Sequence, residues 1–191
     1  LKHGGSVQAT LDLARRVSAS HPEVTFILMS YLNPLYRYGL ERLFEAAAAA
    51  GIKGMIVPDW PVEEIEPWLP KLDELGLSPI LMVTPNTALQ RIERIAKATR
   101  SMIYVVSRMG VTGHETHWGD QFQRYITEIR KHTDLPLAVG FGVRTIDDLQ
   151  ALQGKAEVAA FCSQYIEWQR DDGSEMAASR MKSIVQELGS S

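Results

Sequence analysis

The chain has 191 residues, 45% of them hydrophobic, which is enough to build one sizeable core. A net charge of −3 offers no basic surface, so neither nucleic acid nor an anionic membrane is predicted as a partner. The lone cysteine, Cys162, excludes an internal disulfide and suits a reducing compartment, so a cytoplasmic protein is expected. No apolar run is long enough to cross a bilayer.

Six short apolar runs recur along the chain and predict strands. They are rich in Val, Ile, Leu and Met and lack strict alternation, which is typical of strands buried on both faces of a parallel sheet. In chain order the predicted strands are 24–31, 54–59, 78–84, 101–107, 135–142 and 157–163.

Helical patterns precede, separate and follow these runs. Apolar residues spaced three and four apart predict helices, Gly51 and Gly76 are stop signals, and Thr87 is a plausible N-cap. Thr145 and Asp148 have the spacing of a capping box at the start of a short helix. The other predicted helical stretches lie near 7–17, 40–50, 65–75, 89–96, 122–129 and 181–188.

The alternation of strands and helices predicts one α/β domain over residues 1–191 with a parallel sheet. Two architectures fit this order: an open doubly wound sheet and part of a (β/α)8 barrel. A complete barrel has eight strands and about 250 residues, so length alone favours the open sheet.

Ligands bind at the carboxyl ends of strands in both architectures, so the residues just after each strand are candidates. Gly113, Gly142 and Ser163 together suit an anion site, because glycine lets backbone N–H groups approach a phosphate and serine adds a donor. Taken alone, each glycine is better explained as a tight turn. Tyr104 is either a core residue or a pocket wall. The GVTG loop around Thr112 could be an ordinary loop, yet its two glycines suit the hinges of a lid.

Two polar residues near strand ends are first explained by local structure. Asp59, between two prolines, is expected to order its own loop or to cap the helix at Glu63. Asn33, followed by Pro34, is expected to be a turn residue. The five histidines have no metal-ligand spacing, so no metal site is predicted.

Four motifs in chain order give the sequence a specific resemblance. YLNP, PDWPVEE, YVVSRMGVTG and PLAVGFG occur together between about Gly5 and Val143. In this combination the chain resembles the tryptophan synthase alpha chain family.

The resemblance implies a (β/α)8 barrel that cleaves indole-3-glycerol phosphate to indole and glyceraldehyde 3-phosphate by a retro-aldol step. It implies no cofactor in this chain, with pyridoxal phosphate only in a partner β subunit, and a heterotetramer with that subunit. Residue by residue it implies a substrate site, a lid and a partner-facing surface. The substrate site would contain Tyr104, Thr112, Gly113, Gly142, Ser163, Leu28, Ile56 and Met82. The lid would contain Arg108 and Gly110, and the partner-facing surface would contain Asn33, Asp59 and Pro61.

The sequence departs from the family pattern at both ends. The two acid/base carboxylates of the family align before Leu1, so no catalytic residue is expected in this chain, and the first two barrel strands are expected to be missing. About six βα units therefore remain. At the last strand Cys162 precedes Ser163 where the family has glycine, which leaves open whether the thiol crowds the phosphate.

Three functions therefore stay open: a truncated alpha chain with little activity alone, a non-catalytic module that binds or activates a β subunit, and another phosphate-binding barrel. The two exposed sheet edges expected at strands 24–31 and 157–163 predict either that the chain is part of a longer one or that it oligomerises.

Overall fold

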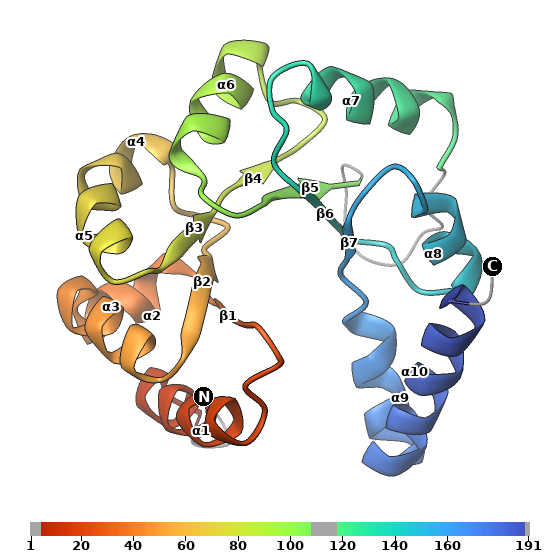
Figure 1. Cartoon of the computed structure of the whole chain (residues 1–191), viewed down its shortest axis with the longest axis horizontal. Helices are drawn as coiled ribbons and strands as arrows, with labels where there is room; N and C mark the ends of the chain where they lie inside the picture. Colours follow the sequence, from red (N-terminus) through yellow and green to blue (C-terminus); the bar gives the residue numbers. More distant parts are fainter. Residues whose placement is uncertain (1–4, 108–117, 190–191) are drawn as a thin grey trace. The chain divides into compact units, whose positions relative to one another are not determined.

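The computed structural model describes residues 5–107 and 118–189. Its residues divide into two compact units (Figure 1), which are described separately. Unit 1 comprises Leu1–Met82 and Leu89–Ile103, and unit 2 comprises Val83–Ala88 and Tyr104–Ser191. No helix in the described part of the chain is long and apolar enough to cross a membrane.

Unit 1 contains a three-stranded parallel sheet in the order β1-β2-β3. Ile56 at the end of β2 is aligned with Met29 of β1 and with Ile80 of β3, so the three strands finish together. The strands are shorter than the apolar runs that predicted them: β1 (Phe26–Met29), β2 (Ile52–Ile56) and β3 (Ser78–Ile80).

Among the residues of unit 1 that the structure describes, seven helical segments accompany this sheet. The helix predicted for residues 65–75 is divided into three short segments, two of which have a proline at their first or second position. Proline lacks an N–H and favours the first turn of a helix, so it marks a new beginning. The segments are α1 (Val7–Ser20), α2 (Leu32–Tyr38), α3 (Leu40–Ala49), α4 (Val62–Ile65), η1 (Glu66–Trp68), α5 (Leu69–Glu74) and α6 (Leu89–Ala98).

The core of unit 1 is centred on Phe44, which is completely buried on α3. Its ring stacks on Trp60 at 6.2 Å between centroids and meets Trp68 edge-on at 5.4 Å. The apolar spacing that predicted α3 therefore places Phe44 between the loop after β2 and the η1 turn. Aromatic contacts of this kind add to the stabilisation from burial.

A second sheet has the strand order β4-β5-β6-β7, and most of its residues belong to unit 2. The single strand predicted at 78–84 is in fact two, because β3 and β4 belong to different sheets. β7 pairs in parallel with β6 through only two residue pairs, at Val158 and Ala159. The strands are β4 (Met82–Val83), β5 (Ile103–Val106), β6 (Leu137–Gly140) and β7 (Val158–Ala159).

In the described residues of unit 2, four helices accompany the sheet. The predicted capping box at α8 is confirmed, because Thr145 Oγ1 accepts from the Asp148 N–H and Asp148 accepts from the Thr145 N–H. α9 was not predicted, and it packs beside α10 as a helical hairpin (Figure 1, blue). The helices are α7 (Asp120–Arg130), α8 (Ile146–Leu152), α9 (Ser163–Asp172) and α10 (Ser174–Gly189).

Two local predictions are wrong. Asn33 lies in the first turn of α2 rather than in a turn, because Pro34 is tolerated where a helix leaves its N–H groups unbonded. Thr87 does not occupy the N-cap position of α6, which begins at Leu89. The Thr87 hydroxyl instead accepts from the Thr84 N–H and closes the preceding turn.

Candidate functional site

Asp59 connects two loops at the carboxyl ends of neighbouring strands in unit 1. Its Oδ1 accepts a hydrogen bond of 2.7 Å from the backbone N–H of Leu32, and Leu32 is the first residue of α2. Asp59 therefore bonds the N-terminus of α2 and not that of the helix at Glu63, where its capping role was predicted. That helix, α4, has Pro61 at its N-cap and no side-chain cap. A carboxylate at a helix N-terminus is stabilised by the helix dipole and by this charge-assisted bond.

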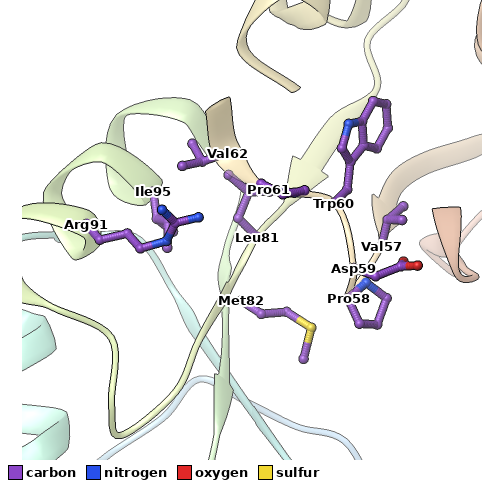
Figure 2. Close-up of a pocket in the computed structure, with 10 residues that line it drawn as sticks. All are labelled: Val57, Pro58, Asp59, Trp60, Pro61, Val62, Leu81, Met82, Arg91 and Ile95. Atoms are coloured by element: carbon purple, nitrogen blue, oxygen red, sulfur yellow. The ribbon is translucent and has the colours of Figure 1, made fainter. Parts of the chain in front are cut away.

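A cavity of about 220 Å³ lies beside the same turn of unit 1. It includes three predicted site residues, the partner-facing Asp59 and Pro61 and the substrate-binding Met82 (Figure 2). In Figure 2 the Trp60 indole and the Asp59 carboxylate point in different directions from the turn. Seven further residues complete the lining: Val57, Pro58, Trp60, Val62, Leu81, Arg91 and Ile95.

Ion pairs hold one wall of this cavity. Arg91 contributes to the lining from α6 and donates two hydrogen bonds to Glu63 of α4, at 2.7 and 3.0 Å. Arg94 bonds both Glu63 and Glu66. A backbone hydrogen bond and the Arg91 guanidinium lower the pKa of Glu63. These charges fix α6 against α4, and the Arg91 guanidinium is already paired in this arrangement.

The strand register separates two residues that the resemblance placed in one pocket. Leu28 is aligned with Met55, whereas Ile56 is aligned with Met29. Neighbouring residues of a strand point to opposite faces, so Leu28 and Ile56 lie on different faces of the sheet. Met29, which is 52% exposed, shares the face of Ile56 and is a candidate that the sequence analysis missed. A one-residue shift in the strand assignment is enough to exchange the two faces.

In unit 2, Tyr104 on β5 lies across the glycine that ends β6. A Cβ atom added at Gly140 would overlap the Tyr104 hydroxyl, so only glycine leaves room for this phenol. The ring also meets Phe141 edge-on at 6.2 Å. Burial raises the pKa of Tyr104 to about 12, so its hydroxyl remains protonated at neutral pH. Tyr104 is therefore a buried residue, and its role as a pocket wall stays a prediction.

The backbone after β6 has a left-handed conformation at two successive residues. Phe141 has φ 65° and Gly142 has φ 96°. The first value costs energy for a residue with a side chain, and such residues concentrate at functional sites. The Ser107 hydroxyl donates to the Phe141 carbonyl, and the Ser107 N–H donates to the Gly140 carbonyl at 3.2 Å. Phe141, 42% exposed, is a second residue that the sequence analysis missed.

Ser163 is the first residue of α9, and both it and Cys162 are exposed. Cys162 occupies the N-cap position without making a side-chain cap. The first N–H groups of this helix therefore lack a side-chain acceptor from their cap, as at helix termini that receive anions. Gly142 and Ser163 are tied together indirectly, because Arg144 bonds Glu167 of α9 at 2.5 Å.

Asp148 fixes the loop between β6 and α8. Its carboxylate accepts from the Trp118 indole at 2.7 Å and from the Arg144 and Thr145 N–H groups. Burial would raise the pKa of Asp148, but these hydrogen bonds outweigh it and the pKa is lowered. The chain from Arg144 onward is thereby held at a defined start of α8.

Several predicted residues cannot be placed. Four residues assigned to the lid or to the substrate site lie outside the described residues: Arg108, Gly110, Thr112 and Gly113. Within the described ranges, no three His, Cys, Asp or Glu side chains are grouped so that they could hold a metal ion.

The family comparison matches residues 1–190 to a single family, described as tryptophan synthase alpha chain. The chain belongs to the tryptophan synthase alpha chain family. Curated alpha chains from Desulfotalea psychrophila and Desulforapulum autotrophicum are 38% and 37% identical to it over 91% and 97% of its length. The chain spans 68% and 73% of those relatives.

Solved structures confirm the predicted barrel-family fold. A protein from Aquifex aeolicus has a TM-score of 0.81 and 28% identity, with 98% of this chain and 69% of that one covered. A tryptophan synthase α2β2 complex from Pyrococcus furiosus has a TM-score of 0.84 and 25% identity, with 98% and 76% covered. This chain therefore corresponds to about two thirds to three quarters of the barrel chains it resembles.

Proposed function

We propose that this chain is the substrate-phosphate-binding and partner-binding part of a tryptophan synthase alpha chain. The activity of such a chain is the cleavage of indole-3-glycerol phosphate to indole and glyceraldehyde 3-phosphate. The observation that carries the proposal is the family match over residues 1–190. With the single cysteine, it also leads us to propose a cytoplasmic protein.

The phosphate end of the substrate is assigned to unit 2. Gly142 has a positive φ that favours glycine, and the exposed residue Ser163 begins a helix of ten residues. Exposed N–H groups at a helix start and the positive end of its dipole both favour a dianion. Tyr104, a buried phenol whose pKa is raised by that burial, is proposed as an apolar wall with a protonated hydroxyl.

The retro-aldol step protonates C3 of the indole and removes a proton from the glycerol hydroxyl on the adjacent carbon. The C–C bond between the indole ring and the glycerol phosphate chain then breaks. These transfers need an acid and a base within hydrogen-bond reach of the substrate. The carboxylates that the resemblance implies for this role match no position among these 191 residues. We therefore propose that this chain alone binds the substrate without cleaving it at a useful rate, and that the step uses no cofactor.

The binding proposal is tested by calorimetry with an indole-glycerol phosphate analogue that cannot be cleaved. We expect saturable binding that competes with glycerol 3-phosphate, and a Ser163→Ala variant that binds several-fold more weakly because a donor is lost. Absence of binding to both ligands would contradict the assignment to unit 2.

A second candidate function is a non-catalytic module that activates a β subunit, and the Asp59–Leu32 hydrogen bond favours it. That bond joins the loop that carries Asp59 and Pro61 to the first turn of α2, which carries Asn33. The resemblance assigns all three residues to the partner. Serine-dependent tryptophan formation by a bacterial tryptophan synthase β subunit, with indole added, is the measurement. We expect the chain to raise the rate, and no stimulation at saturating chain would remove this candidate.

A further inference from the structure

A salt bridge joins the loop after β6 to the start of α9 in unit 2. Arg144 Nη2 lies 2.5 Å from Glu167 Oε2. Arg144 follows Gly142 by two residues, and Glu167 follows Ser163 by four. The bridge therefore connects the two described segments to which the proposed function assigns the phosphate.

The geometry of a helix places the Glu167 carboxylate close to Ser163. Residues four apart lie on the same helix face, about 5–6 Å apart at their Cβ atoms. Helical side chains also tilt toward the N-terminus, so the Glu167 side chain leans back over the first turn of α9. The Arg144 guanidinium is bonded to that carboxylate, so it reaches the same face of α9.

We propose that Arg144 is an anion-binding residue of the phosphate site and that Glu167 holds its guanidinium while the site is empty. This inference rests on the proposed function, since it concerns how the same site is regulated. A phosphate dianion and the Glu167 carboxylate compete for one guanidinium, and arginine binds either group through paired N–H donors. Ligand binding then exchanges one partner of Arg144 for the other.

Both side chains have the freedom for this exchange. Arg144 is 41% exposed and Glu167 is 35% exposed, so neither is enclosed in the core. The backbone of Arg144 is held separately, because its N–H donates to Asp148 at 2.8 Å. The guanidinium can therefore leave Glu167 while the loop keeps its position. Glu167 itself repels an incoming anion, which makes it a selective competitor rather than a simple support.

A purely structural role for the Arg144–Glu167 bridge predicts a different result from a role in which Glu167 competes with phosphate for Arg144. Arg144→Gln and Glu167→Gln both break the same contact, so a structural role would change phosphate affinity in the same direction in both variants. Under our proposal the first variant removes the cation that binds phosphate, and the second removes its competitor. The two affinities must then move in opposite directions.

The experiment is a calorimetric titration of inorganic phosphate and of glycerol 3-phosphate into the full chain and its variants. We expect Arg144→Gln to weaken binding roughly tenfold, as for the loss of a hydrogen bond to a charged group. Arg144→Lys should retain part of the affinity, because the charge remains without the planar fork. Glu167→Gln should tighten binding roughly threefold, a size typical of exposed charges.

A matched control lies at the other end of the same helix. Arg180 pairs with Asp172, the last residue of α9, at 2.9 Å. Arg180→Gln and Asp172→Asn change the same charges far from Ser163 along α9, so they should shift the affinity by less than about twofold.

The outcomes separate the two proposals. If the wild-type chain binds neither ligand, the proposed phosphate site and this inference both fall. If it binds them but Glu167→Gln fails to tighten binding, or Arg144→Gln shifts it no more than Arg180→Gln, only this inference is overturned. A misfolded Glu167→Gln protein cannot mimic tighter binding, and circular dichroism checks the fold of Arg144→Gln.

Discussion

The core of unit 1 and the C-terminal hairpin of unit 2 are stabilised in different ways. Unit 1 buries large side chains, with Phe44, Leu35, Leu43 and Leu72 fully enclosed among its helices and sheet. The C-terminal hairpin of unit 2 has no buried residue in α9 and buries Ala177 in α10. Its contacts include a cation–π pair, Arg180 over Trp168, and the Arg180–Asp172 ion pair.

This difference separates stability from binding. Close packing leaves little freedom for a side chain to change partners, whereas half-exposed charges can do so at small cost. Of the residues proposed to contact phosphate, Ser163 belongs to this hairpin, and Arg144 is joined to it through the bond to Glu167. Local opening and ligand-dependent rearrangement are expected there first.

The strongest test of this comparison removes one aromatic ring from each region. Phe44→Ala should lower the free energy of unfolding by about 3–5 kcal/mol, because it leaves a cavity beside Trp60 and Trp68. Trp168→Ala, in the half-exposed hairpin, should cost less than about 2 kcal/mol. Urea unfolding of both variants measures the difference. Equal losses would show that the hairpin is packed as tightly as the core of unit 1.

A second test asks how tightly unit 2 is packed at β6, where Leu137 and Val139 are completely buried. Gly140→Ala would drive a methyl group into the Tyr104 phenol and should cost about 1–3 kcal/mol. The matched control is Gly119→Ala, since a Cβ at Gly119 has nothing within 4 Å. Thermal unfolding is the readout, and combining Gly140→Ala with Tyr104→Phe should recover part of the loss. If both glycine variants behave alike, the close approach at β6 is not tight.

A third test concerns the loop that presents Arg144. Asp148→Ala removes the capping box and the Trp118 contact, and should cost about 1–2 kcal/mol. The neighbouring Asp147→Ala is the control. The lowered pKa of Asp148 means that its contribution is complete above about pH 4, the value of an unfolded aspartate. It is lost as the pH falls further, through the folded-state pKa.

The pH dependence of stability tests whether the Asp148 carboxylate acts through its charge. Unfolding free energies measured between pH 7 and pH 3 should fall more steeply in the wild type than in Asp148→Asn. Parallel curves for the two proteins would mean that the carboxylate does not stabilise the loop through its charge.

The smallest effect is expected at the loops of unit 1. Asp59→Ala removes the acceptor of the Leu32 N–H and should cost about 1 kcal/mol, whereas Asp59→Asn retains an acceptor and should cost less. Unfolding and stimulation of a β subunit are measured on the same preparations. Loss of stimulation with little loss of stability would support a role in positioning, and unchanged stimulation would limit Asp59 to capping α2.

Part of the fold and of the site was predictable because it depends on local periodicity. The spacing of Leu40, Leu43, Phe44 and Ala47 predicted α3, and Thr145 with Asp148 predicted the start of α8. Both patterns act within one or two helical turns, where hydrogen bonding and side-chain direction follow from the residues themselves. The motifs also predicted the family, which residues 1–190 confirm.

Other features were decided only by tertiary structure. The sequence shows an apolar run at 24–31, but the pairing of β1 with β2 determines that Met29, and not Leu28, shares a face with Ile56. Asp59 meets Leu32, and Arg144 meets Glu167, across 27 and 23 residues. Register and long-range contacts depend on how strands align and loops close, and no short stretch of sequence contains that information.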